Sequence, residues 1–275
     1  MTGGPILATA APYRYLIRMA GIFDISGRIA VVIGGTSGIG RTLALGLAEH
    51  GANVIPTGRR EDRLEEVCGQ IEGLGRSTLF QTTDVESRAA IDALRDAVLK
   101  QFGRIDILVN AAGYTMKQPT ATMPEEQWSA LINTNLNGVL RACQSFYEPL
   151  KANSRGRVIN IASLGSFLAF HEVAAYCASK TAVLSLTRSL ACEWARDGVN
   201  VNAIAPGVFP TELNSKLILE TPRGQELLSR TPMGRLGKPE ELIGIAVLLS
   251  SDAAGFLTGQ CIAVDGGYLA SGVNT

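Results

Sequence analysis

The sequence predicts an α/β protein built on one doubly wound parallel sheet of about seven strands, with helices on both faces. Short runs of β-branched and other apolar residues alternate with longer amphipathic segments from residue 28 onward. A glycine cluster joins the first such run to the first helical pattern. No repeat, low-complexity segment or linker interrupts the alternation, so we expect a single domain over residues 23–275.

Each element follows from its own pattern. The strand-like runs are RIAVVIG (28–34), NVIPT (53–57), STLFQTTD (77–84), IDILVNAAG (105–113), GRVINIAS (156–163), VNVNAIAPG (199–207) and QCIAVDGG (260–267). Helical periodicity covers residues 41–50, 60–75, 87–102, 125–150, 174–197 and 239–251. Residues 209–235 are predicted as a long loop. Crossovers between parallel strands place all carboxyl ends at one edge of the sheet, where such folds bind ligands.

The composition points to a small-molecule partner. The chain has 25 basic and 25 acidic residues, so it lacks the basic excess that binds nucleic acid, and no apolar run is long enough to cross a membrane. Five scattered cysteines and two histidines predict neither a disulfide framework nor a metal site, and they fit a cytoplasmic protein. Residues 1–22 lack the pattern of a secretory signal and are predicted to be an N-terminal extension, either disordered or an incorrectly assigned start.

The stretch VVIGGTSGIG predicts a phosphate-binding turn. Gly34, Gly38 and Gly40 stand between the first strand and a helix expected to begin near Gly40. A helix N-terminus offers unpaired N–H groups and a positive dipole end to a pyrophosphate, and glycines let the backbone approach it closely. The spacing is G-x-x-x-G-x-G, which differs from the common dinucleotide-binding fingerprint, so this turn alone leaves a purely structural role open.

The end of the second strand favours NADP over NAD. About 20 residues after the glycine turn, an NAD-binding protein places an acidic residue near the ribose 2′-hydroxyl. This chain has Arg59 and Arg60 there instead. A guanidinium attracts a 2′-phosphate, which a carboxylate would repel.

Three residues predict proton-transfer chemistry. Tyr176 and Lys180 are four residues apart on a predicted helix, so both side chains lie on one face, and Ser163 ends the preceding strand. A phenol has an ordinary pKa of about 10, too high for ready exchange near neutrality. We expect the Lys180 ammonium and a nicotinamide cation to lower the pKa of Tyr176.

These motifs together resemble the short-chain dehydrogenase/reductase family, over roughly residues 23–268. The family's glycine turn reads T-G-x-x-x-G-x-G, and its catalytic segment is Y-x-x-x-K with an upstream serine. The resemblance implies a Rossmann-like fold and an NAD(P)-dependent oxidoreductase. It implies catalytic roles for Asn135, Ser163, Tyr176 and Lys180. It also implies a cofactor site formed by Gly34, Thr36, Ser37, Gly38, Ile39, Gly40, Arg59, Arg60, Asp84, Val85, Asn110, Ala111, Gly113, Tyr176, Lys180, Pro206, Gly207, Val208 and Thr211.

One position departs from the family pattern. Ile33 stands where the glycine motif usually has a threonine, whose hydroxyl helps to tie the glycine turn to the NAAG turn. We expect its loss to loosen or rearrange that contact without abolishing cofactor binding.

The substrate is less determined than the chemistry. The sequence resembles sugar-acid and polyol dehydrogenases, with 3-oxoacyl-carrier-protein reductases as the alternative. A cofactor-sensing regulator without activity is the alternative of another class, and the complete catalytic set weighs against it. Candidate substrate contacts are Tyr114, Lys117, Leu164 and Phe170. The resemblance also implies a homotetramer, in which the helices around Asn135 and Tyr176 pair across subunits.

Overall fold

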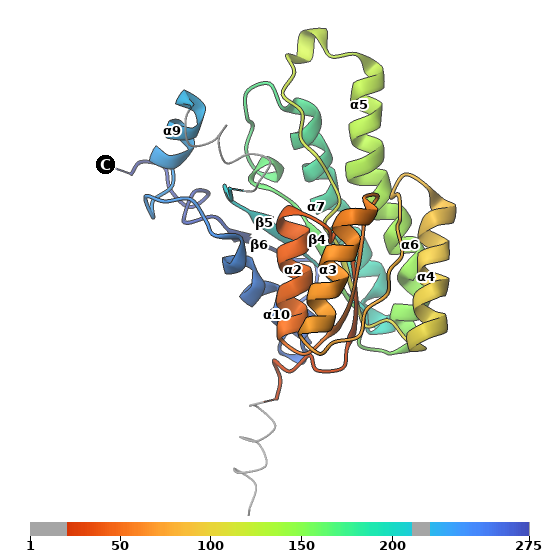
Figure 1. Ribbon diagram of the computed structural model, residues 1–275. Coiled ribbons are helices and arrows are strands. Elements are labelled where there is room, and N and C mark those ends of the chain that lie inside the picture. The colour runs from red at the N-terminus through yellow and green to blue at the C-terminus, as the bar shows by residue number, and fades with distance from the viewer. Residues whose placement is uncertain (1–20, 211–220, 275) are drawn as a thin grey trace, which may run out of the picture.

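The structure, a computed structural model, describes residues 21–210 and 221–274. Its centre is a parallel sheet of six strands in the order β2-β1-β3-β4-β5-β6. Figure 1 shows the helices packed around this sheet. The strands are β1 Ile29–Ile33, β2 Asn53–Thr57, β3 Ile107–Asn110, β4 Arg157–Ile161, β5 Asn200–Pro206 and β6 Cys261–Val264. The chain runs outward from β1 to β2 and then returns to the other side of β1 as β3. The crevice beyond β1 and β3 is therefore the ligand position expected of a doubly wound sheet.

Helices cover both faces of this sheet, as predicted. They are α2 Gly38–Glu49, α3 Glu61–Gly73, α4 Arg88–Phe102, α5 Glu125–Ile132, α6 Gly138–Ala152, α7 Ala174–Trp194, α9 Pro222–Ser229 and α10 Ile243–Ser250. Alternate residues of β1 point to opposite sides. Ala30 and Val32 pack with α2, α3 and α10, whereas Val31 and Ile33 pack with α4, α6 and α7. All five residues of β1 are buried, as is typical of a strand covered on both faces.

The predicted third strand, residues 77–84, is not a strand. The segment runs beside β2, but its contacts there include side chains: Ser77 N–H donates to Asn53 Oδ1, and Thr57 Oγ1 donates to the carbonyl of Gln81. Asn53 N–H and the Thr57 carbonyl form hydrogen bonds on the side of β2 that faces β1. Backbone groups alternate in direction along a strand, so those of Pro56 face the outer edge of the sheet. Proline has no N–H to donate, and a regular ladder is therefore interrupted on that edge.

Helical segments differ from the predictions in several places. Residues 222–229, predicted as loop, form α9, whose N-terminus is capped by Thr221 accepting from Gly224 N–H at 3.2 Å. The predicted helix 125–150 is divided by a π-helical turn at Asn133–Asn137. The predicted helix 239–251 begins with a short 3₁₀ turn, Pro239–Leu242. The predicted extension over residues 1–22 lies outside the described residues, except for its last two.

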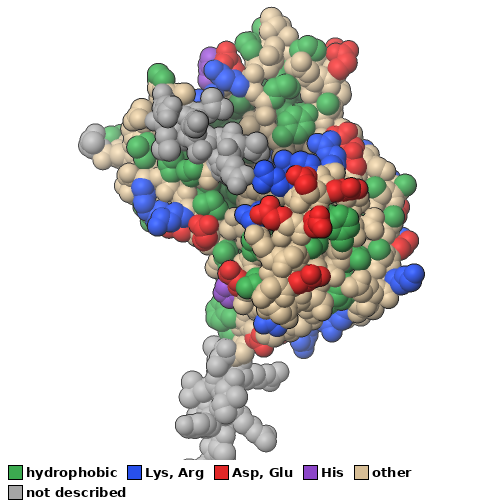
Figure 2. All heavy atoms as spheres, in the orientation of Figure 1, with side chains coloured by type: hydrophobic (Ala, Val, Ile, Leu, Met, Phe, Trp, Pro, Cys, Tyr) green, Lys and Arg blue, Asp and Glu red, His purple; other side chains and the backbone are tan. Residues whose placement is uncertain are grey.

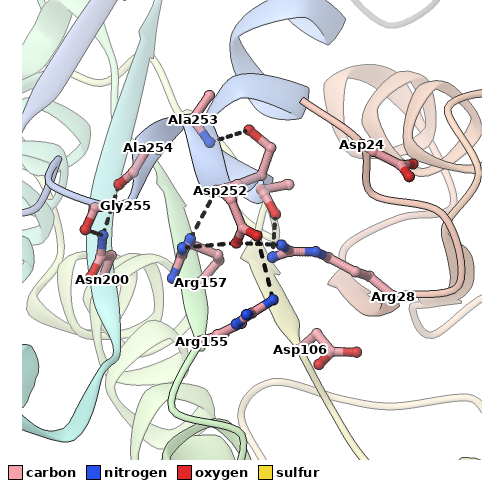
Figure 3. Close-up of polar contacts among 12 residues, drawn as sticks. Asp24, Arg28, Asp106, Arg155, Arg157, Asn200, Asp252, Ala253, Ala254 and Gly255 are labelled. Carbon is pink, nitrogen blue, oxygen red and sulfur yellow. Dashed lines mark hydrogen bonds and ion pairs between the residues drawn. The ribbon is translucent and has the colours of Figure 1, made fainter. Parts of the chain in front are cut away.

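The amino ends of the strands are joined by an arginine cluster. Arg28, Arg155 and Arg157 converge on Asp252, which lies after α10 (Figure 3). Arg28 approaches Asp252 at 2.6 Å, and Arg157 Nε donates to the Ser251 carbonyl at 3.2 Å. The cluster therefore ties β1 and β4 to the C-terminal part of the chain, at the edge of the sheet opposite the ligand crevice.

Within the described ranges, no helix has the length and apolar character needed to cross a membrane. The same part of the chain contains no group of three or more His, Cys, Asp or Glu residues arranged to hold a metal ion.

Candidate active site

The glycine cluster forms a tight turn between β1 and α2. Gly34 and Gly38 have φ of +81° and +51°, a region that residues with a Cβ rarely adopt. A Cβ on Gly34 would lie 2.5 Å from the backbone nitrogen of Ala112, and one on Gly40 would lie 2.1 Å from the Gly34 carbonyl oxygen. α2 begins at Gly38, two residues before the predicted start, so its first unpaired N–H groups lie at the turn. This close, side-chain-free backbone fits a pyrophosphate group.

The turn is held without the family threonine. Gly34 and Gly35 both donate their N–H groups to the Thr57 carbonyl, at 2.9 and 3.0 Å, and Ala111 N–H donates to the Ile33 carbonyl at 2.9 Å. The Ile33 side chain is 2% exposed and belongs to the core. Backbone hydrogen bonds and close packing therefore join the two turns in the absence of this hydroxyl, and the effect of its loss on the contact stays a prediction.

The end of β2 carries the two predicted arginines. Arg59 and Arg60 are exposed, and Arg60 is the N-cap residue of α3. Figure 2 shows Lys and Arg side chains gathered next to acidic ones over the N-terminal ends of α2 and α3. Thr83 N–H donates to the Gly58 carbonyl at 3.0 Å, and this bond brings Asp84-Val85 to the same end of the sheet. The structure thus places both predicted pieces of the adenosine site together.

The Asn110 side chain is buried and forms a hydrogen bond with the neighbouring strand. Asn110 Nδ2 donates to Asn160 Oδ1 at 2.8 Å, and Asn160 Nδ2 donates to Thr187 Oγ1 of α7 at 2.9 Å. The three residues are at most 3% exposed. They form a buried polar chain that joins β3, β4 and α7. Sequence reasoning missed Asn160 and Thr187, because an isolated polar residue in an apolar segment does not indicate its partner.

The π-helical turn between α5 and α6 positions Asn135. A π turn shifts the helical register by one residue and is often found at functional sites. The Asn135 side chain is fully buried: Nδ2 donates to the Tyr114 carbonyl at 2.9 Å and to Ser179 Oγ at 3.2 Å, and Oδ1 accepts from Tyr114 N–H at 3.0 Å. A Cβ on Gly113 would lie 3.1 Å from Asn135 Oδ1 and 3.5 Å from Lys180 Nζ. Asn135 and Lys180 therefore lie on one side of the NAAG turn.

Ser163 and Tyr176 meet at the carboxyl end of β4. Ser163 follows this strand and accepts a hydrogen bond from Gly165 N–H at 3.1 Å, and Tyr176 lies in the first turn of α7. Burial raises the pKa of Tyr176, and its hydrogen bond with Ser163 acts in the opposite direction. The protein's own groups therefore do not produce the lowered phenol pKa that we expected, because desolvation of the phenolate outweighs them.

Lys180 is a buried cation one turn further along α7. Its side chain is 5% exposed, and Nζ donates to the Ile161 carbonyl at 2.7 Å. Nζ lies 5.9 Å from the centre of the Tyr176 ring. Burial lowers the pKa of Lys180 to about 8. Lys180 and Tyr176 thus share one face of α7, as their spacing predicted.

The loop after β5 reaches the same edge of the sheet. Pro206 ends β5, and Gly207 N–H donates to the Val264 carbonyl of β6 at 2.8 Å. Val208 follows and is half-buried. The remaining predicted contact of this loop, Thr211, lies outside the described residues.

The four candidate substrate contacts differ in exposure. Tyr114 is 41% exposed and Phe170 is half-buried, whereas Leu164 is only 3% exposed. The structure therefore does not present the Leu164 side chain as expected, because it packs into the protein under the 3₁₀ turn that it begins. Lys117 is exposed and forms an ion pair of 3.1 Å with Glu172, a residue that sequence reasoning did not single out.

Comparison with known proteins decides the family. A family model described as enoyl-(acyl carrier protein) reductase matches residues 34–269. Gluconate 5-dehydrogenase of Gluconobacter oxydans is 40% identical over 253 residues, which cover 91% of this chain and 98% of the relative. The chain belongs to the short-chain dehydrogenase/reductase family. It is therefore a nicotinamide-dependent oxidoreductase with a Rossmann-like fold, as the resemblance implied.

Two further members show the range of the similarity. The NAD-dependent glycerol dehydrogenase of Listeria innocua is 37% identical over 246 residues, which cover 90% of this chain and 95% of the relative. A crystal structure of gluconate 5-dehydrogenase from Burkholderia cenocepacia, in complex with NADP and tartrate, superposes with a TM-score of 0.88 at 38% identity. The superposition covers 92% of this chain and 99% of that one.

Proposed function

We propose that this protein transfers a hydride between NADP(H) and a carbonyl or secondary alcohol of a sugar acid or polyol. One observation carries the proposal: Ser163, Tyr176 and Lys180 lie together at the carboxyl end of β4, at the same edge as the glycine turn. The similar proteins are named for a sugar acid and a polyol, which supports this substrate class.

Tyr176 exchanges the proton of the reaction. Its phenol donates a proton to the substrate oxygen during reduction and removes one from the alcohol during oxidation. Ser163 donates a hydrogen bond to the same oxygen and stabilises the charge that develops on it. When bound, the nicotinamide supplies or accepts the hydride, and the protein contributes orientation and electrostatics.

Lys180 and Asn135 support this proton exchange. The Lys180 ammonium favours the phenolate of Tyr176 and holds the nicotinamide ribose. We assign Asn135 the role of holding a water molecule that links Lys180 to solvent, so that the proton can be replaced. Its bonds to the Tyr114 backbone keep the amide fixed for this role.

The cofactor occupies the crevice beyond β1 and β3 in this proposal. The glycine turn binds the pyrophosphate, Asp84 and Val85 contact the adenine, and the loop after β5 contacts the nicotinamide. Arg59 and Arg60 bind the 2′-phosphate, so NADP(H) is preferred and NAD(H) is accepted more weakly. The NADP complex of a 38% identical structure supports this preference, although one relative is named NAD-dependent.

A paired cofactor and substrate screen tests the proposal. Initial rates are measured at the reduced-nicotinamide absorbance band with each cofactor, against sugar acids, polyols and a 3-oxoacyl thioester. We expect turnover with the first two classes and higher catalytic efficiency with NADP(H). Turnover of the thioester alone would establish the 3-oxoacyl reductase instead. Cofactor binding, followed by fluorescence, with no turnover of any compound would indicate a cofactor-sensing regulator.

The assembly we propose is a homotetramer of a cytoplasmic protein. Pairing of α5, α6 and α7 with a second copy would cover Trp128 on α5, which is 39% exposed. All five cysteines are free thiols, and four of them are at least partly buried, which suits a reducing compartment. Light scattering coupled to size-exclusion chromatography gives the mass in solution, and a monomer would contradict this assembly.

A further inference from the structure

The turn at His171 and Glu172, just before α7, is fixed in an unusual conformation. Glu172 has φ of +63°, and it is one of two residues other than glycine with positive φ among the described residues. Such a backbone costs energy and persists only where neighbouring contacts hold it. Here Gln118 N–H donates to the Glu172 carbonyl at 2.7 Å, and Arg223 Nη1 donates to the His171 carbonyl at 3.1 Å. The turn is thus held between the loop after β3 and α9.

The Glu172 side chain pairs with a predicted substrate contact. Its carboxylate lies 3.1 Å from Lys117 Nζ and 3.5 Å from His171 Nδ1. The hydrogen bond from Lys117 and the nearby charges of Lys117, His171 and Arg223 hold the pKa of Glu172 below its ordinary value. These neighbouring groups form a position that suits a carboxylate, and the side chain of Glu172 occupies it.

This ion pair lies at the edge of the proposed active site. Lys117 is four residues after Gly113, which lies against Asn135 and Lys180, and Glu172 is four residues before Tyr176. Four residues span at most about 14 Å of chain. The Lys117 side chain is 62% exposed and that of Glu172 is 25% exposed, so a ligand can reach the pair from solvent.

We propose that Glu172 is a specificity-determining residue, whose carboxylate occupies Lys117 and competes there with the carboxylate of a sugar acid. An uncharged polyol has no group that needs Lys117, so Glu172 leaves its binding unchanged. This inference rests on the proposed function, because it assumes that sugar acids and polyols both reach the site. A sugar acid must separate Lys117 from Glu172 before it can form its own ion pair.

The test is a comparison of two substrates of equal length. Gluconate and the uncharged hexitol sorbitol are oxidised by wild-type protein and by the Glu172→Gln, Lys117→Met and doubly substituted variants, and kcat/KM is measured for each. Gln keeps the size of the side chain and removes its charge. We expect Glu172→Gln to raise kcat/KM for gluconate roughly two- to fivefold, the range of an exposed ion pair, and to leave sorbitol unchanged.

Two further arms isolate the mechanism. In the Lys117→Met background the Glu172→Gln substitution should no longer favour gluconate, because the group in competition is absent. High salt should reduce the advantage of Glu172→Gln, since it screens an exposed pair. The matched control is Glu226→Gln on α9, which removes the carboxylate of an exposed pair with Arg230 and should change kcat/KM for neither substrate.

The outcomes separate this inference from the proposed function. An unchanged gluconate-to-sorbitol ratio in Glu172→Gln overturns the role of Glu172, and so does an equal loss with both substrates, which would make the pair structural. If wild-type protein oxidises neither compound and no other sugar acid or polyol, the proposed substrate class itself is wrong.

Discussion

A buried cation lies at each end of β4, and the two cations have different surroundings. At the amino end Arg157 donates to the carbonyls of Gly156 and Ser251 and lies 3.7 Å from the Asp252 carboxylate. At the carboxyl end Lys180 donates to the Ile161 carbonyl alone among its described contacts. Burial lowers the pKa of both groups, and that of Lys180 falls to about 8.

Their different partners and pKa values suit the two cations to different roles, a structural one for Arg157 and proton exchange for Lys180 in the proposed mechanism. A guanidinium stays protonated at any physiological pH, so Arg157 with Asp252 serves as a permanent tie between β4 and the C-terminal segment. An ammonium whose pKa approaches neutrality can exchange protons, as the proposed mechanism requires of Lys180. Removing charges at the two ends should therefore change different properties of the protein.

The largest effect is expected at the phenol. Tyr176→Phe should retain cofactor binding and lose turnover by about 10²- to 10⁴-fold, the usual contribution of a general acid or base. Initial rates and cofactor fluorescence check the two halves of this statement. The matched control is Tyr147→Phe, which removes a hydroxyl bonded to Asp197 on another part of the surface and should keep normal rates. Near-normal rates in Tyr176→Phe would refute the role of Tyr176.

Lys180→Met should inactivate the protein and stabilise it. The folded protein holds the Lys180 pKa near 8, against an ordinary value of 10.5, so folding disfavours the charged form. The resulting cost is fully present below pH 8 and amounts to about 3 kcal/mol at most. Between about pH 8 and 10.5 the unfolded chain keeps a proton that the folded protein has lost. The contribution of Lys180 therefore increases the wild-type free energy of unfolding as the pH rises through this range.

Urea unfolding at pH 7, 8.5 and 10 measures this effect. The variant should be more stable than wild type at pH 7, and the gap should narrow toward pH 10. A variant that is less stable at pH 7 would show that the hydrogen bond to Ile161 outweighs the cost of burial.

Asp252→Asn should have the opposite profile at the other end of β4. It removes the charge that accepts hydrogen bonds from Arg28 and Arg155 and forms an ion pair of 3.7 Å with Arg157. Hydrogen bonds to charged groups contribute about 2 kcal/mol each. Because 43% of the Asp252 side chain is exposed, we expect a total loss of about 2 kcal/mol, with kcat unchanged. A fall in kcat with unaltered stability in urea would contradict the purely structural role of the Asp252 cluster.

The smallest effect concerns the glycine turn. Ile33→Val removes one buried methylene and should lower the free energy of unfolding by about 1 kcal/mol. Cofactor affinity should be almost unchanged, because backbone hydrogen bonds hold the turn. Ile33→Thr, which restores the family hydroxyl, should also leave the affinity close to wild type. A marked gain in affinity would mean that the missing hydroxyl matters more than the backbone contacts indicate.

Local patterns predicted most of the fold. The alternating runs located all six strands, and the Tyr176–Lys180 spacing correctly placed these two side chains on one face of α7. The strand predicted at residues 77–84 failed because β-propensity does not show that Pro56 interrupts the neighbouring edge. α9 was missed because its eight residues are too few to show a clear helical period. The π turn was missed because the apolar period continues nearly unchanged across it.

The sequence by itself determined the family and the parallel arrangement of the sheet, and it predicted which residues gather at the carboxyl edge, because these depend on residue types at short, regular spacings. Only the tertiary structure decided which distant polar and charged side chains meet. Arg157 reaches Asp252, Lys117 reaches Glu172 and Asn160 reaches Thr187 across gaps of 27 to 95 residues. Such pairings follow from packing in three dimensions, and each residue alone is compatible with many partners.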